Sequence, residues 1–242
     1  MQKPYLLCIA HRGAMGHAPE NTLLSIRKAI AMGAPCIEID VYFVDGQLVV
    51  FHDDRLERTT NGVGYLCEST FDYLRSLDAG KGQKIPTLEE VCAEIGSSAC
   101  LNIELKGPMT AAPVASLITQ LVDNGWDINR ILVSSFHHRE LLALRGSNRN
   151  IKLGALLKGI PVDDAKFAEE LNAFSVHPSL EFVDQRFVDD AHTRGMKVYV
   201  YAVDHPDDMV RMQKIGVDGV FTGFPERVLE HYSQCDTSTG WC

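Results

Sequence analysis

The sequence has no excess of basic residues. Its 242 residues include 23 lysines and arginines against 32 aspartates and glutamates, so the net charge at pH 7 is −9. Proteins that bind nucleic acids or anionic membranes use a basic surface to neutralise phosphate groups. The composition therefore predicts that the protein has no nucleic-acid partner and no stable association with membranes.

Long apolar segments and paired cysteines are also missing. No apolar run approaches the roughly 18 residues that a membrane-spanning helix needs, and a strand is predicted from near Tyr5, where a secretory signal would lie. The seven cysteines form no CxxC pair, and four lie in apolar runs or predicted helices, where a thiol packs as a small hydrophobic group. We therefore expect reduced cysteines, no zinc site and a cytoplasmic location.

Short β-rich runs alternate with helical patterns along the chain. The strands are predicted at residues 6–11, 36–43, 48–52, 100–106, 131–136, 151–156, 173–177, 197–203 and 219–222. The helices are predicted at residues 22–32, 87–95, 112–124, 138–145, 163–171, 184–194, 206–214 and 225–232. Several strands are almost entirely apolar, which is typical of parallel strands covered on both faces.

This alternation predicts an α/β fold with a parallel sheet. An Asp45-Gly46 turn joins two predicted strands into a hairpin, which leaves eight strand–helix units, the number in a closed TIM (β/α)8 barrel. No GxGxxG turn follows the first strand, which disfavours a dinucleotide-binding fold. We predict one domain over residues 1–242, with a small insertion after the second strand at about 54–84. Because the insertion is polar and rich in glycine, we expect it to form no core of its own.

Acidic side chains lie inside two of the predicted strands. Glu38 and Asp40 share one face of their strand, and Asn102, Glu104 and Lys106 share one face of theirs, because strand side chains alternate. Carboxylates that face a barrel interior repel one another unless a cation lies between them. We predict that Glu38, Asp40 and Glu104 bind one divalent cation, Mg²⁺ or Ca²⁺, and that Lys106 holds an anionic substrate. The alternative to a metal site is that the acidic or polar face of each strand simply points into solvent.

Two histidines and an arginine lie at the ends of neighbouring strands. His11 and Arg12 end the first predicted strand, where a barrel carries out its chemistry, and His52 ends the hairpin. Histidine titrates near neutral pH and suits acid–base catalysis, whereas arginine suits phosphate because its planar fork donates two hydrogen bonds. The alternative interpretations are that His11 and Arg12 are ordinary surface residues at the start of a loop, and that His52 is a structural residue. Asn21 or Thr22 is predicted to cap the next helix.

Together, these residues resemble the glycerophosphodiester phosphodiesterase family. The shared motifs occur in the family's order along nearly the whole chain: His11-Arg12-Gly13, Pro19-Glu20-Asn21-Thr22, Glu38-Ile39-Asp40-Val41, Asp45-Gly46, His52-Asp53, Arg58-Thr59-Thr60-Asn61-Gly62, Pro86-Thr87-Leu88, Asn102-Ile103-Glu104-Leu105-Lys106, Ser134-Ser135-Phe136 and Gly216-Val217-Asp218-Gly219. The resemblance implies a TIM barrel with a small insertion after the second strand. It also implies metal-dependent hydrolysis of a small-molecule glycerophosphodiester to glycerol 3-phosphate and an alcohol, through a cyclic phosphate.

The resemblance assigns roles to individual side chains. The implied roles are metal binding by Glu38, Asp40 and Glu104, acid–base catalysis by His11 and His52, phosphate binding by Arg12 and Lys106, and further substrate contacts by Phe136 and Tyr201. The chain departs from the usual family pattern at the barrel mouth, where it has Tyr201-Ala202-Val203-Asp204 and Thr222-Gly223-Phe224-Pro225. We expect the insertion, including Tyr65 and Phe71, to cap the mouth on the side of the leaving alcohol.

Three questions stay open at this point. A related barrel enzyme that acts on lipids, of the lysophospholipase D or phospholipase C type, is the nearest alternative function. A barrel that binds a phosphoester without catalysis is a second alternative. The sequence also leaves open the preferred head group and the oligomeric state, a homodimer included.

Overall fold

A computed structural model of the chain describes residues 4–235 and 240–241. Within these residues, eight parallel strands form the barrel: β1 (Leu7–Ala10), β2 (Cys36–Val44), β4 (Cys100–Leu105), β5 (Ile131–Ser135), β6 (Lys152–Leu157), β7 (Ser175–Pro178), β8 (Lys197–Val200) and β9 (Gly219–Thr222). Each strand pairs with the next, and β1 pairs with both β2 and β9, which closes the sheet. The predicted TIM barrel is confirmed.

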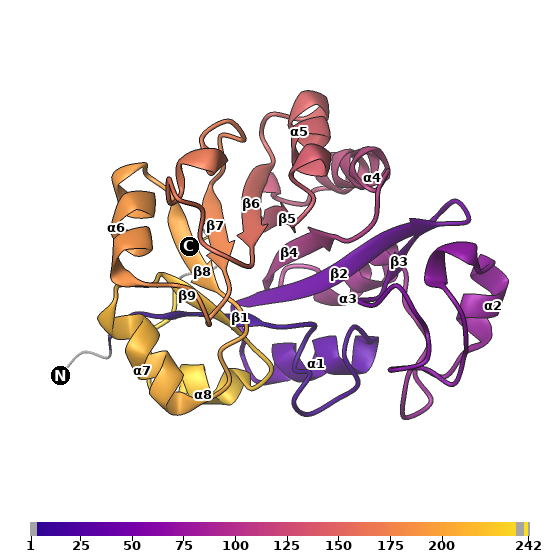
Figure 1. Cartoon of the computed structure of the whole chain (residues 1–242). Helices are drawn as coiled ribbons and strands as arrows, with labels where there is room; N and C mark the ends of the chain where they lie inside the picture. The colour runs from indigo at the N-terminus through magenta and orange to yellow at the C-terminus, as the bar shows by residue number, and fades with distance from the viewer. Residues whose placement is uncertain (1–3, 236–239, 242) are drawn as a thin grey trace.

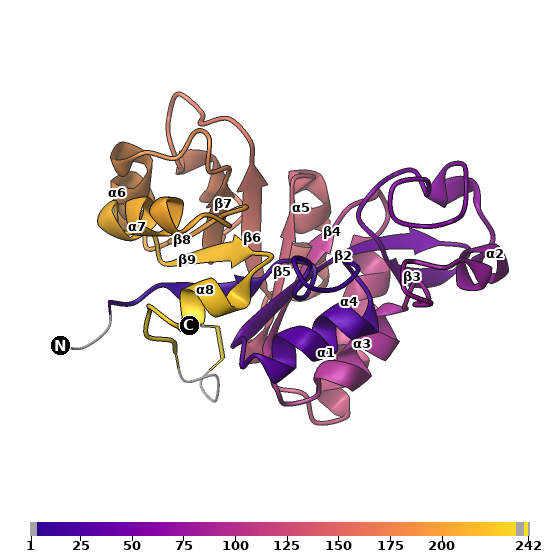
Figure 2. The same cartoon turned by 90° about the horizontal axis from the view of Figure 1, so that it is seen from below.

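Helices surround the barrel on its outer side (Figure 1). The α-helices that follow barrel strands are α1 (Leu23–Ala31), α3 (Leu88–Ile95), α4 (Ala111–Asp123), α5 (His138–Ser147), α6 (Gln185–Thr193), α7 (Pro206–Lys214) and α8 (Pro225–Leu229). Local sequence explains where they begin: Thr22 and Thr87 cap α1 and α3 with their side chains, and Pro206 opens α7. In Figure 2, α1 and α3 lie side by side.

The helix predicted at residues 163–171 is wrong. This segment has only the short 3₁₀ turn η3 (Lys166–Ala168). Asp164 adopts a φ of 52°, outside the right-handed helical region, and the backbone N–H of Ala165 donates to Asp190 Oδ2. The backbone N–H of Ala165 therefore bonds to a side chain of α6 in place of a carbonyl within a helix. No local sequence pattern reveals this long-range contact.

The barrel interior is filled at the amino-terminal ends of its strands. Side chains on the outer faces of the strands pack against the helices, and a separate apolar group lies inside: Leu7, Ile9, Cys36, Cys100, Leu132, Tyr199, Phe221 and Trp241. Trp241 comes from the carboxyl-terminal segment, and its backbone N–H donates to Asn129 O at 2.9 Å. This packing closes one end of the barrel and leaves the carboxyl-terminal end for polar side chains.

The insertion and the hairpin before it share a hydrophobic core separate from that of the barrel, so the expectation that the insertion forms no core is wrong. β2 extends past the barrel and pairs antiparallel with β3 (Gln47–Val50), and the chain then forms η1 (Leu66–Glu68) and α2 (Phe71–Ser76) beside this hairpin (Figure 1). The buried cluster comprises Val44, Val49, Phe51, Leu56, Leu66, Leu74, Leu77, Ala79 and Ile85. Its leucines lie far apart in an otherwise polar segment, so they produce no periodic pattern.

The prediction of reduced cysteines is wrong at one position. Cys235 is disulfide-bonded, whereas Cys8, Cys36, Cys67, Cys92 and Cys100 are free. Across the described residues, no helix has the length and apolar character that a membrane crossing requires.

Candidate active site

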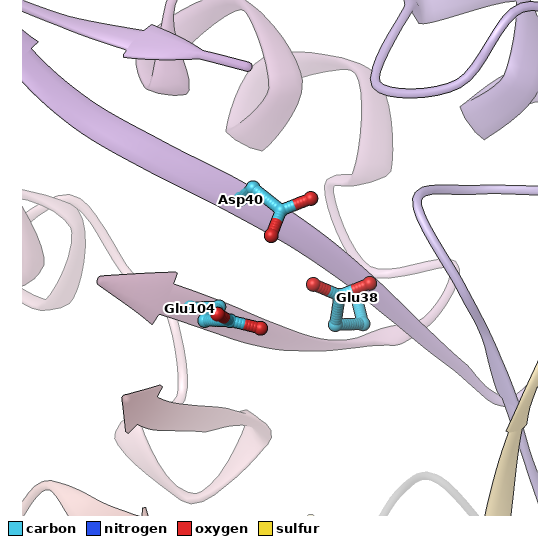
Figure 3. A group of neighbouring side chains, drawn as sticks. All are labelled: Glu38, Asp40 and Glu104. Carbon is cyan, nitrogen blue, oxygen red and sulfur yellow. The ribbon is translucent and has the colours of Figure 1, made fainter. Parts of the chain in front are cut away.

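Three carboxylates meet inside the carboxyl-terminal end of the barrel. The register of β2 and β4 places Asp40 opposite Glu104, and Glu38 lies two residues before Asp40 on the same face. Ligand oxygens of all three side chains lie within 4.8 Å of one another, and Figure 3 shows the carboxyl groups converging. The structure thus brings together the predicted metal ligands.

The charges of this carboxylate cluster are incompletely compensated. Burial and the neighbouring carboxylates raise the pKa of Glu38 well above its ordinary range, and burial together with Asp40 raises the pKa of Glu104 to about 7. Lys106 Nζ lies 3.0 Å from Glu104 Oε1 and 3.7 Å from Asp40 Oδ1. Among the described residues, Glu38 Oε1 and Asp40 Oδ1 are buried without a hydrogen-bond partner. Hard carboxylate oxygens of this kind fit a divalent cation.

Arg12 lies beside this cluster and contacts two of its carboxylates. It has a φ of 53° at the end of β1, and its backbone N–H donates to Glu38 Oε2 at 2.9 Å. Its guanidinium donates to Glu20 Oε1 at 2.7 Å, and Nε lies 3.3 Å from Asp40 Oδ2. The side chain is therefore held in place from two sides beside the carboxylates.

Both predicted acid–base histidines reach the same pocket. His11 Nε2 lies 3.9 Å from Glu38 Oε2, beyond hydrogen-bond distance. Burial, with Arg12 and His52 nearby, lowers the pKa of His11 well below its ordinary value. Burial also lowers the pKa of His52, although Asp40 and Asp53 oppose that shift. Both shifts favour the neutral ring, which is the form that can accept a proton.

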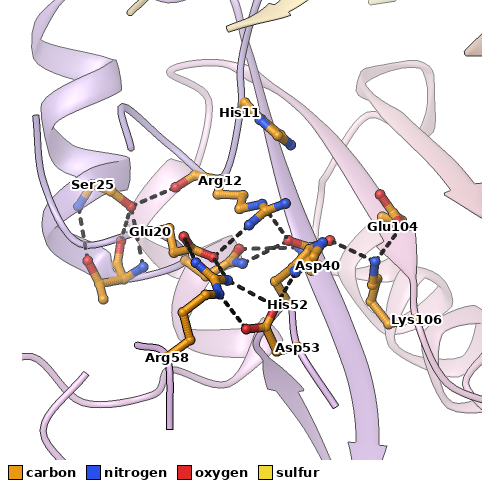
Figure 4. A network of polar contacts seen from close by, with 12 residues as sticks. His11, Arg12, Glu20, Ser25, Asp40, His52, Asp53, Arg58, Glu104 and Lys106 are labelled. Carbon is orange, nitrogen blue, oxygen red and sulfur yellow. Dashed lines mark hydrogen bonds and ion pairs between the residues drawn. The ribbon is translucent and has the colours of Figure 1, made fainter. Parts of the chain in front are cut away.

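Sequence reasoning missed a chain of hydrogen bonds and ion pairs that joins His52 to Arg12 (Figure 4). His52 Nδ1 lies 2.6 Å from Asp53 Oδ1, and Arg58 donates to both oxygens of Asp53. The same guanidinium donates to both oxygens of Glu20, at 2.8 and 2.7 Å, and Glu20 accepts from Arg12. The sequence did point to these residues, because Glu20, Asp53 and Arg58 all lie in the family motifs quoted above. Only the fold shows that these motifs contact one another.

The pocket above the carboxylates has a polar side and an aromatic side. It is lined by His11, Arg12, Glu38, His52, Asn102, Glu104, Lys106, Ser134, Phe136, Leu156, Tyr201 and Phe221. The Phe136 and Tyr201 rings pack edge to face with centroids 5.6 Å apart, and Lys106 Nζ lies 6.0 Å from the Phe136 ring centre. The Tyr201 hydroxyl donates to Leu157 O at 3.0 Å.

The insertion contributes nothing to this lining among the described residues. Tyr65 packs instead under the guanidinium of Arg55, and Phe71 packs against the insertion's own core. The unusual Asp204 and Gly223 also lie outside the lining set, where Asp204 Oδ1 accepts from the Gly223 N–H at 2.8 Å. The predicted cap formed by Tyr65 and Phe71 is therefore wrong.

Comparison with known proteins agrees with this arrangement. Residues 11–227 match the family described as Glycerophosphoryl diester phosphodiesterase. This chain belongs to that family. A glycerophosphodiester phosphodiesterase of Caldanaerobacter subterraneus subsp. tengcongensis is 36% identical over 234 residues, which cover 92% of this chain and 96% of that protein. A glycerophosphodiester phosphodiesterase of Bacillus subtilis is 33% identical over 248 residues, covering 91% and 84%.

Solved structures of the family share the fold. An Oleispira antarctica phosphodiesterase, solved in complex with the product sn-glycerol-3-phosphate, superposes with a TM-score of 0.86 at 30% identity. The match covers 94% of this chain and 96% of the other. A glycerophosphodiester phosphodiesterase from Galdieria sulphuraria, described as putative, superposes with a TM-score of 0.85 at 26% identity.

Proposed function

We propose that this protein hydrolyses glycerophosphodiesters to glycerol 3-phosphate and an alcohol, with the help of one divalent cation. The observation that carries this proposal is the convergence of three carboxylates, two histidines, Arg12 and Lys106 on one pocket in a member of this family. The product bound by the Oleispira relative supports glycerol 3-phosphate as the product here.

The carboxylate cluster would hold the cation. Glu38, Asp40 and Glu104 offer oxygen ligands, and the two buried oxygens without partners fit a metal better than they fit solvent. When bound, the cation supplies positive charge that stabilises the phosphoryl oxygens. The same three carboxylates accept Mg²⁺ or Ca²⁺.

The other side chains would bind the phosphate and move protons. Arg12 and Lys106 bind the non-bridging phosphate oxygens, which adds charge stabilisation in a largely buried site. His52 donates its Nδ1 proton to ionised Asp53, so its Nε2 carries the lone pair that accepts a proton from the glycerol 2-hydroxyl. The hydroxyl oxygen then bonds to phosphorus, and the bond from phosphorus to the alcohol oxygen breaks.

His11 would complete the proton transfers. It donates a proton to the departing alcohol oxygen, and the anionic phosphodiester beside it favours the protonated ring that this step requires. The product of this step is a cyclic glycerol phosphate. Water then opens the ring while the two histidines exchange roles, and glycerol 3-phosphate leaves.

The test is to measure release of glycerol 3-phosphate from glycerophosphocholine, with and without chelator, and then with Mg²⁺ or Ca²⁺ restored. We expect activity that chelator abolishes and one of the two ions restores. A phosphodiester without a hydroxyl next to the phosphoester should not react, and an intact diacyl lipid should react poorly. Tight binding of glycerophosphocholine without turnover would instead indicate a non-catalytic barrel, and faster turnover of lysophosphatidylcholine would indicate a lipid-directed enzyme.

We also propose a cytoplasmic enzyme on the basis of its acidic composition and of the five free cysteines among the described residues. The disulfide at Cys235 weighs against this location, because cytosolic proteins seldom keep structural disulfides. Fractionation of cells that express the tagged protein would decide between these observations.

A further inference from the structure

Asn21 lies next to the metal site in an unusual backbone conformation. It is 3% exposed in the loop between β1 and α1, and its φ is 56°. L-residues seldom adopt this left-handed region, although asparagine tolerates it better than most. The backbone N–H of Asn21 donates to Arg12 O at 3.0 Å, and Thr22 next to it caps α1. Contacts on both sides therefore hold the strained residue in place.

The side chain of Asn21 grips Asp40 at two points. Asn21 Nδ2 donates to Asp40 Oδ2 at 2.8 Å, and Asn21 Oδ1 accepts the backbone N–H of Asp40 at 3.2 Å. The first contact fixes the carboxylate of Asp40, and the second ties the amide to the strand that carries it. Such a pair of bonds leaves the Asp40 side chain little rotational freedom.

The two oxygens of Asp40 consequently have different surroundings. Oδ2 accepts from Asn21 and lies 3.3 Å from Arg12 Nε. Oδ1 has no hydrogen-bond partner among the described residues, and Lys106 Nζ lies 3.7 Å away. An amide can hold Oδ2 in this way without adding a fourth negative charge beside the cluster.

We propose that Asn21 is a positioning residue of the metal site, which holds Asp40 Oδ2 and leaves the buried Oδ1 to bind the cation. This inference rests on the proposed function, because it assumes that the three carboxylates bind a cation. Partners that orient metal ligands typically change metal affinity by about 10- to 100-fold when they are removed. The Pro19-Glu20-Asn21-Thr22 motif thereby acquires a role beyond helix capping.

The test is the variant Asn21→Gly, which removes the amide and relieves the positive φ at the same time. Isothermal titration of the chelator-stripped protein with Ca²⁺ and with Mg²⁺ should show affinity that is lower by about 10- to 100-fold. Glycerophosphocholine turnover should fall at low metal concentration and recover in part at high metal concentration. A merely structural role would alter the melting temperature without this metal-dependent recovery.

Asn61→Gly is the matched control. Asn61 also accepts the backbone N–H of an aspartate, that of Asp78 at 2.8 Å, but it does so in the exposed insertion. The metal affinity of the Asn61→Gly variant should equal that of the wild type. Should Asn21→Gly fail to fold, Asn21→Ser decides the question in the same titration, since serine is too short to make both contacts.

Wild-type metal affinity in the folded Asn21 variant would overturn the positioning role. A wild-type protein that binds neither ion would instead overturn the metal in the proposed function. The two failures are thus distinguishable, because the wild-type titration is read first.

Discussion

His52 Nδ1 lies 2.6 Å from Asp53 Oδ1. Hydrogen bonds from Arg58, together with that from His52, lower the pKa of Asp53 to about 2 despite partial burial, so the aspartate is ionised at neutral pH. An ionised carboxylate accepts the Nδ1 proton, which leaves Nε2 of the neutral ring as the acceptor. The pair therefore selects the tautomer that a general base needs.

Replacing Asp53 should test this pairing. Asp53 raises the pKa of His52, so Asp53→Asn should lower that pKa further and move the acidic limb of the kcat/KM profile to lower pH. Turnover at pH 7 should also fall, because the asparagine side chain no longer enforces one tautomer. Asp54→Asn makes the same charge change at the exposed neighbouring position and should leave the profile in place. An unshifted profile in Asp53→Asn would contradict the pairing.

The two histidines themselves should be needed for turnover and dispensable for metal binding. His11→Ala and His52→Ala should each lower kcat by roughly 10²–10⁴-fold, the usual effect of losing positioned proton transfer. Calorimetric titration should find wild-type metal affinity in both variants, since neither ring belongs to the carboxylate cluster. Near wild-type turnover in His52→Ala would mean that this histidine is structural.

Arg58 should matter for turnover although it lies in the insertion and outside the pocket lining. It is the only described side chain that contacts both Glu20 and Asp53, through two hydrogen bonds to each. Arg58→Lys keeps the charge but loses the planar fork, so kcat should fall while metal affinity stays constant. Arg55→Lys is the control, because Arg55 pairs with Glu57 in the same insertion. Equal kcat in the two variants would contradict a role for Arg58.

The carboxylate cluster should make the metal-free protein sensitive to pH. The pKa of Glu104 is about 7 in the folded chain, above the ordinary value of a glutamate, so its ionisation at higher pH destabilises the fold. Glu104→Gln should therefore melt at a higher temperature than the wild type in chelator at about pH 9, and the difference should shrink as the pH falls through 7. A change of about 1 kcal/mol corresponds to roughly 2–4 °C in a chain of this size.

Added metal provides the comparison for that measurement. Ca²⁺ or Mg²⁺ should raise the melting temperature of the wild type more than that of Glu104→Gln, because the variant offers one charged ligand fewer. A difference between the two proteins that stays constant with pH would contradict the raised pKa of Glu104.

The aromatic side of the pocket should set head-group preference. Phe136 is 46% exposed at the mouth and packs edge to face against Tyr201. Phe136→Ala should change the ratio of kcat/KM for glycerophosphocholine and glycerophosphoglycerol several-fold, since contacts remote from phosphorus select the leaving alcohol. Tyr65→Ala, in the insertion, should leave this ratio unchanged. The reverse pattern would restore the insertion as the cap of the pocket.

Much of this protein could be predicted from local patterns. The alternation of strands and helices specified the barrel, because parallel strands covered by helices are apolar and regularly spaced. Side chains alternate along β2 and β4, which placed Glu38, Asp40 and Glu104 on the inward faces of these strands. The inward faces of all strands in a closed barrel meet in one interior, so the three side chains were expected to lie close together. The proposed metal ligands therefore followed from periodicity, with the family resemblance in support.

Contacts between segments without periodicity required the folded chain. Arg58 meets Glu20 across 38 residues and Asn21 meets Asp40 across 19, and no local pattern predicts either pair. The insertion looked too polar for a core because its leucines are scattered, and they gather only when β2 and β3 offer a surface to pack on. Long-range pairs of this kind depend on how loops close and on which side chains reach one another. For that reason the proposed catalytic groups were visible in the chain, while the residues that contact them became visible only in three dimensions.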